Sequence, residues 1–168
     1  MVRKVLCPTD FSEGAEAGWN VALALAMQFE AEVILLHVVP EPPRLTEAYQ
    51  RGYTPERFIE ATAVEARRLL EHLAAKAADC DLKTSWKVRR GVEFREISAA
   101  AAEEGADLIV LGTHGRSALP GLLLGSVAER VAGAAPCPVL LVRSPAFHSP
   151  LLGTEHQRAA EGRERAAT

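Results

Sequence analysis

Residues 112–126, GTHGRSALPGLLLGS, have the composition and spacing of an anion-binding loop. Gly112 directly follows an apolar run, Gly115 comes three residues later, and Gly125 and Ser126 open a helical segment. Glycine lets the backbone turn tightly or approach a ligand closely. The unpaired amides at a helix start, together with the helix dipole, favour an anion. The spacing G-x2-G-x9-G-S therefore predicts two turns that clasp a polyphosphate between them.

A plainer interpretation of the same residues is helix capping. Ser126–Glu129 (SVAE) has the S-x-x-E form of a capping box, with Ser126 as the cap. In the anion interpretation the amides of Val127, Ala128 and Glu129 face a phosphate instead, and Arg116 adds a positive charge. A position directly after a buried strand favours the anion site, while the hydroxyl of Ser126 fits either role.

The composition limits the classes of protein to which this chain could belong. The 168 residues suit one domain, with 48% hydrophobic and 24% charged residues. A net charge of -3 argues against a dedicated nucleic-acid binder. The three cysteines are far apart and form no CxxC pair, so we expect a reducing, cytoplasmic setting. The longest uncharged run, residues 17–29, has 13 residues, so we expect no membrane span, and we also expect no signal peptide.

Hydrophobic patterns alternate between strand and helix along the chain. A continuous apolar run at 32–39 predicts a strand buried on both faces, while the weaker alternation at 82–90 predicts an edge strand. Ser12 and Thr54 are expected helix caps, and Gly105 an expected helix end. Trp19 and Trp86 are expected to pack. The predicted strands cover 2–8, 32–39, 82–90, 107–111 and 139–143, and the predicted helices 13–30, 55–78, 92–105 and 126–134.

This alternation predicts an α/β fold with an open five-stranded parallel sheet and helices on both faces. Because the first, second and fourth strands are the most apolar, they belong in the centre. The common five-stranded arrangement then has the order 3-2-1-4-5, which reverses between strands 1 and 4. Ligands bind outside the carboxyl ends of the strands at such a switch point. The loops 8–12 and 112–126 should meet there.

The stretch GTHGRSALPGLLLGSVAERVAGAAPCPVLLVR, together with PTDFSEGAEAGWNVALALA near the start, resembles the universal stress protein family. The resemblance covers about residues 1–144, which we expect to form the domain. The polar residues 145–168 are expected to form a disordered or helical tail. The resemblance implies a Rossmann-like fold of the adenine nucleotide alpha hydrolase-like type, with the order 3-2-1-4-5. In this family the G-x2-G-x9-G-[S/T] motif marks members that bind ATP.

The resemblance also assigns roles to residues. The adenosine side would be lined by Pro8, Thr9 and Asp10, and backbone groups of Val38 would contact the base. The ribose and phosphates would be bound by Gly112, His114, Gly115 and Arg116. The β- and γ-phosphates would be bound by Gly125, Ser126 and Val127. Mg²⁺ would be held mainly by phosphate oxygens, so we expect no cage of protein ligands.

Three polar residues, Asp10, His114 and His37, can be interpreted either as ligand contacts or as structural residues. Asp10 is expected to contact the ligand, but an acid near a helix start is also stabilised by the dipole. His114 fits phosphate or ribose contact and simple exposure equally well. His37, within the apolar run EVILLHVV, is expected to be a core or interface histidine with its hydrogen bonds satisfied.

The chain lacks the sequence motifs that are typical of several other functions. The chain has no G-x4-G-K-[S/T] loop, no G-x-G-x-x-G after the first strand, no G-x-S-x-G and no H-E-x-x-H. With no evident general base we expect at most slow ATP hydrolysis. The sequence thus predicts a nucleotide-dependent stress-response switch or sensor. The alternative is a nucleotide-free, partner-binding dimer. The resemblance implies a homodimer formed through the last strand, Val139–Arg143.

Overall fold

The computed structural model describes residues 1–40, 54–115 and 124–144. Each strand and helix predicted from the sequence is present, with ends that differ by at most two residues. The strands are β1 (Lys4–Pro8), β2 (Glu32–Pro40), β3 (Thr84–Gly91), β4 (Leu108–Gly112) and β5 (Val139–Val142). The helices are α1 (Glu13–Phe29), α3 (Pro55–Ala78), α4 (Glu93–Glu104) and α5 (Ser126–Ala134).

The five strands form one sheet in the order β3-β2-β1-β4-β5, and every neighbouring pair is parallel. The predicted order is therefore confirmed. The connection from β1 runs to β2 on one side, whereas β4 lies on the other side of β1, so the order reverses between β1 and β4. Parallel pairing places the ends of β1 and β4 at the same edge of the sheet.

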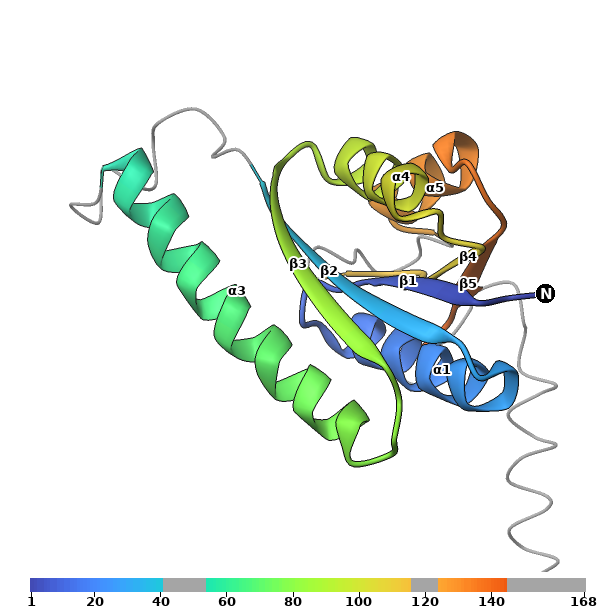
Figure 1. Ribbon diagram of the computed structural model, residues 1–168. Helices are drawn as coiled ribbons and strands as arrows, with labels where there is room; N and C mark the ends of the chain where they lie inside the picture. The colour runs from blue at the N-terminus through green and yellow to red at the C-terminus, as the bar shows by residue number, and fades with distance from the viewer. Residues whose placement is uncertain (41–53, 116–123, 145–168) are drawn as a thin grey trace, which may run out of the picture.

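Helices cover both faces of the sheet, with α1 and α3 on one face and α4 and α5 on the other (Figure 1). Residues of β2 alternate between the two cores: Val33 and Leu35 pack with α1 and α3, while Ile34 and Leu36 pack with α4 and α5. This double burial explains the unbroken apolar run of β2. Trp19 is buried in the α1 and α3 core, as predicted.

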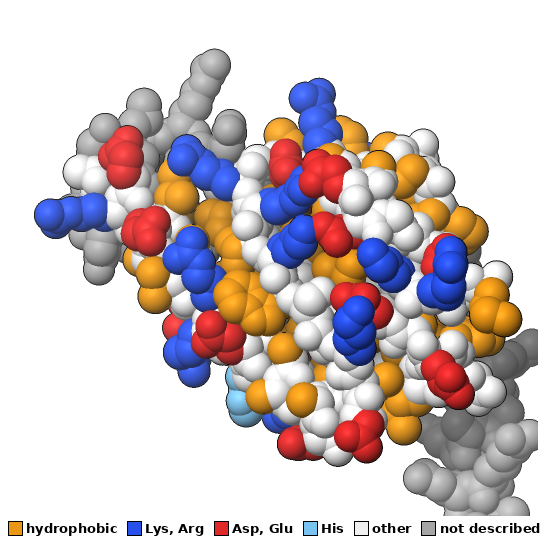
Figure 2. Space-filling view, viewed as in Figure 1, with side chains coloured by type: hydrophobic (Ala, Val, Ile, Leu, Met, Phe, Trp, Pro, Cys, Tyr) orange, Lys and Arg blue, Asp and Glu red, His pale blue; other side chains and the backbone are white. Residues whose placement is uncertain are grey.

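The edge strand β3 is tied to α4 by ion pairs. Lys87 pairs with Glu104, and Arg89 pairs with Glu103 and, at 3.4 Å, with Glu96. Cationic and anionic side chains are interspersed over the face seen in Figure 2. The side chains of these ion pairs remain partly exposed to solvent. Solvent-exposed ion pairs contribute about 0–1 kcal/mol each, so the apolar cores supply most of the stability. Among the described residues, no helix combines the length and the apolar character needed to cross a membrane.

Candidate functional site

The loop after β1 is closed by its own side chains. The Thr9 amide extends the sheet by donating to the Leu36 carbonyl at 2.8 Å. The Thr9 hydroxyl then accepts from the Phe11 amide at 3.0 Å. The Asp10 carboxylate accepts from the Ser12 amide at 3.0 Å and from its hydroxyl at 2.5 Å. These bonds fix Asp10, which is half-buried, at the carboxyl end of β1.

The loop after β4 is joined to the start of α5. The Thr113 amide donates to the Val142 carbonyl at 2.8 Å, and the Thr113 carbonyl accepts from the Gly125 amide at 2.7 Å. The second bond brings Gly125 back to the end of β4 although eleven residues separate it from Thr113. The two ends of the glycine-rich stretch therefore lie together, as the spacing predicted. Arg116 lies outside the described residues.

The predicted capping box at Ser126 is wrong. The N-cap of α5 is Gly125, in an extended conformation with φ -71° and ψ 150°, and no side chain in the described part of the chain caps this helix. Ser126 is the first helical residue and its side chain is exposed. The reason is tertiary: the bond between Gly125 and Thr113 fixes where the helix begins. Because the Glu129 amide donates to the Gly125 carbonyl at 3.0 Å, the amides without an intrahelical partner are those of residues 126–128.

The starts of α1 and α5 differ in their capacity for an anion. In α1 the Ser12 hydroxyl accepts from the Ala15 amide at 3.2 Å, and Glu13 and Glu16 add negative charge to the first turn. The first turn of α5 has one acid, Glu129, and no side-chain cap. A phosphate is therefore favoured at α5, where the amides and the dipole are not already compensated.

Close packing explains three of the glycines. A Cβ at Gly112 would overlap the Gly14 carbonyl oxygen of α1, so the missing side chain lets helix and strand touch. A Cβ at Gly115 would overlap Oδ2 of Asp10, which shows that the loops after β1 and β4 meet. A Cβ at Gly125 would stand 3.1 Å from the Thr113 carbonyl oxygen. Any contact of these glycines with a ligand stays a prediction.

Val38 is positioned for a backbone role only. Its side chain is 8% exposed and belongs to the core under α4 and α5. Backbone groups of alternate residues point to the same neighbouring strand, and Leu36 points to β1, as its bond with Thr9 shows. The N–H and C=O of Val38 thus point to the side where β1 has already ended at Pro8. Val127 likewise packs into this core, which leaves its amide for the site.

Both histidines near the site are buried. His114 is 8% exposed, and its Nδ1 lies 2.9 Å from the Thr113 hydroxyl, so it is not the exposed loop residue of one interpretation. His37 is 6% exposed and its Nδ1 lies 2.7 Å from the Thr9 carbonyl oxygen, which agrees with the predicted satisfied histidine. Its ring stacks on Phe11 with 4.8 Å between centroids.

Sequence reasoning missed Gly14 and Gly18 of α1. A Cβ at Gly14 would overlap the His114 carbonyl oxygen, and one at Gly18 would stand 3.0 Å from the Gly112 nitrogen. Glycine inside a helix is unfavourable by about 1 kcal/mol relative to alanine. Two glycines four residues apart on one face were thus a signal that another backbone packs there.

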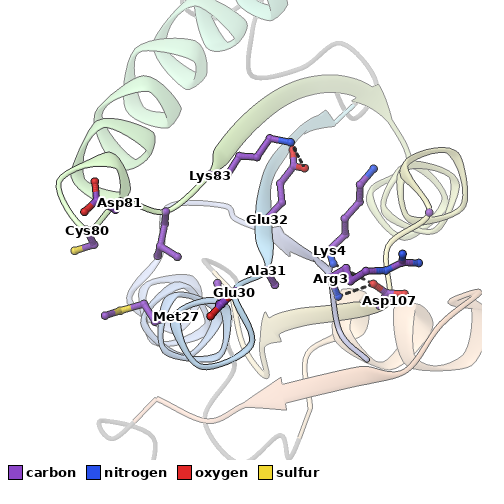
Figure 3. A pocket seen from close by; sticks show the side chains of 13 residues that line it. Arg3, Lys4, Met27, Glu30, Ala31, Glu32, Cys80, Asp81, Lys83 and Asp107 are labelled. Atoms are coloured by element: carbon purple, nitrogen blue, oxygen red, sulfur yellow. Dashed lines mark hydrogen bonds and ion pairs between the residues drawn. The ribbon is translucent and has the colours of Figure 1, made fainter.

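An open depression of about 800 Å³ lies at the opposite edge of the sheet, near the amino ends of the strands. Figure 3 shows the ion pair of Lys83 with Glu32, 3.0 Å long, and the Asp107 carboxylate, which accepts from the amides of Arg3 and Lys4. These bonds hold the pKa of Asp107 below its usual range. Because this depression lies away from the switch point, we do not assign the site there. Among the described residues, no three His, Cys, Asp or Glu side chains gather as a metal site.

Comparison with known proteins decides the family. The model of the universal stress protein family matches residues 1–143. The chain belongs to this family. It is 34% identical over 145 residues to universal stress protein MJ0531 of Methanocaldococcus jannaschii, which covers 86% of this chain and 84% of that protein. The structure of MJ0577, from the same organism, superposes with a TM-score of 0.75 at 34% identity and covers 85% of this chain and 96% of that one.

Two more distant structures share the fold and contain nucleotides. A universal stress protein in complex with cAMP is 23% identical, with a TM-score of 0.62, over 85% of this chain and 98% of that one. A universal stress protein from Archaeoglobus fulgidus in complex with dAMP is 21% identical, with a TM-score of 0.59, over 84% of this chain and 98% of that one. At this identity the likeness shows the fold alone.

Proposed function

We propose that this universal stress protein binds ATP with Mg²⁺ at the carboxyl edge of its sheet and acts as a nucleotide-dependent stress-response switch or sensor. The observation that carries the proposal is the start of α5. None of the described side chains caps it, and the Thr113–Gly125 bond holds it at the end of β4. The family membership and the nucleotide complexes of two proteins with this fold support the proposal.

The residues present fit a nucleotide that spans the two loops. The nucleoside end is lined by Pro8, Thr9 and Asp10, where Asp10 offers its carboxylate, and the backbone of Val38 faces the same space. At the phosphate end the amides of residues 126–128 and the exposed hydroxyl of Ser126 favour anionic oxygens. The backbone of Gly112, His114 and Gly115 lies between these ends. Arg116, the predicted phosphate contact, lies outside the described residues. When bound, Mg²⁺ neutralises phosphate charge and is held mainly by phosphate oxygens.

We also propose a homodimer that forms through β5. This strand is at the edge of the sheet, so none of the described strands pairs with the outer side of its backbone. Leu140 in its middle is 38% exposed, and Val139, Leu141 and Val142 are half-buried. An apolar edge strand invites pairing with a second copy. We further propose that residues 1–144 form the domain, and that its three free thiols reflect a reducing, cytoplasmic compartment.

The test of ATP binding begins with protein purified without added nucleotide. We expect denaturation to release ATP, and calorimetry with Mg-ATP to give saturable binding. Gly125→Val should block the approach of phosphate to the start of α5 and abolish binding. Gly133→Val is the matched control, because nothing lies within 4 Å of a Cβ at that position. Absence of both released nucleotide and binding at about 1 mM ATP would leave the nucleotide-free partner-binding dimer as the better hypothesis.

A further inference from the structure

The loop after β1 contains a residue in an unfavourable backbone conformation. Phe11 has a φ of 62°, in the left-handed region that bulky side chains rarely adopt. Such conformations persist only where surrounding contacts enforce them. Asp10, the residue before Phe11, is the carboxylate of the proposed nucleoside end.

Three contacts enforce this conformation, and His37 makes two of them. The Phe11 amide donates to the Thr9 hydroxyl at 3.0 Å. The His37 ring stacks on the Phe11 ring at 4.8 Å with 28° between their planes. Nδ1 of His37 lies 2.7 Å from the Thr9 carbonyl oxygen. Because a carbonyl oxygen only accepts, Nδ1 carries a proton and donates it. His37 thus contacts the residues on both sides of Asp10, which are Thr9 and Phe11.

We propose that His37 is a positioning residue that sets the Asp10 carboxylate for the nucleoside, an inference that rests on the proposed function. His37 lies two residues after Leu35, so its side chain faces the core of α1 and α3. The uncapped start of α5 lies on the other face of the sheet (Figure 1). His37 is therefore expected to act indirectly, through its contacts with Thr9 and Phe11. These contacts hold the loop in the conformation that places the Asp10 carboxylate against Ser12 and Gly115.

Three substitutions separate the hydrogen bond from the ring. His37→Asn keeps an N–H at the δ position and loses the ring. His37→Gln carries its N–H one atom further out, and His37→Phe keeps the ring without a donor. The same substitutions at His72, an exposed histidine of α3, are the matched controls. We expect His37→Gln and His37→Phe to weaken ATP binding about tenfold and His37→Asn by about threefold or less, since only the last keeps the bond to Thr9.

Two further readouts distinguish positioning from general destabilisation. Inorganic tripolyphosphate, which contacts only the phosphate end, should bind all variants with the wild-type Kd. In the ligand-free protein, amide hydrogen exchange at Phe11 and Ser12 should accelerate about tenfold in His37→Gln and His37→Phe, because both amides depend on this loop.

The outcomes decide between the hypotheses. Equal ATP affinity and equal exchange in all variants would overturn the inference. Parallel loss of ATP and tripolyphosphate binding with a lower melting temperature would also overturn it, since that is the behaviour of a merely structural histidine. If the wild-type protein binds neither ligand, the proposed function fails, and the exchange data alone decide whether His37 holds the loop.

Discussion

The carboxylate of Asp10 lies so close to Gly115 that a Cβ on this glycine would overlap Oδ2. The two residues are far apart in sequence and come from the loops after β1 and β4, on either side of the point where the strand order reverses. Their contact joins the proposed nucleoside end of the site to the loop that leads to the phosphates. Several consequences can be measured.

Gly115→Ala should displace the Asp10 side chain and weaken ATP binding by about tenfold, which corresponds to about 1.4 kcal/mol. The melting temperature should change little, because the displaced atoms are the end of a half-buried side chain. Calorimetry with Mg-ATP and a thermal melt check both statements. Gly133→Ala in α5 is the control and should bind as the wild type does. Wild-type affinity in Gly115→Ala would show that Asp10 is not placed by this contact.

Gly14→Ala should destabilise the fold, because its Cβ would overlap the backbone oxygen of His114 and neither backbone can move freely. Overpacking of this kind costs about 1–3 kcal/mol or more. Gly105→Ala meets no atom within 4 Å and has only a φ of 62° to overcome, so it should cost about 1 kcal/mol. Urea denaturation measures both free energies of unfolding. A smaller loss at Gly14 than at Gly105 would contradict the packing argument.

The strand order and the helix ends follow from local patterns and were predictable. Thr54 caps α3 by accepting from the Arg57 amide at 3.3 Å, and Gly105 ends α4 in a left-handed conformation. The start of α5 at Ser126 was also predicted, but the role of Gly125 as its N-cap was not predictable, since it depends on the bond of Gly125 to Thr113. The same holds for His114, whose burial depends on how the loop folds against α1.

Ser12→Ala and Ser126→Ala should differ in their effect on stability. Ser12→Ala removes the cap of α1 and should lower stability by about 1 kcal/mol. Ser126→Ala removes an exposed hydroxyl that caps nothing, so stability should be unchanged while the affinity for ATP falls. Denaturation and calorimetry on the two variants test this contrast. A loss of stability in Ser126→Ala equal to that in Ser12→Ala would restore the capping interpretation.

The thiol of Cys7 should be inert in the folded protein. Burial raises its pKa from 9.0 to about 12, whereas Cys80 is exposed. Near pH 8 a thiol reagent should label Cys80 quickly and Cys7 only after unfolding. Because the folded pKa is the higher one, the stability linked to this thiol is present below pH 9.0 and is lost as the pH rises toward about 12. Cys7→Ala should remove that part of the alkaline loss of stability, and rapid labelling of Cys7 in the native protein would contradict the burial.

The dimer proposal predicts that a charge on the β5 edge separates the subunits. Leu140→Asp introduces repulsion and a desolvation cost at a residue that is 38% exposed in the single chain. We expect the wild-type protein to scatter light as a dimer at micromolar concentration and the variant as a folded monomer. Val64→Asp on α3 is the control, since Val64 is 54% exposed and lies on another surface. If Val64→Asp dissociates the dimer and Leu140→Asp does not, the subunits meet through α3 rather than through β5.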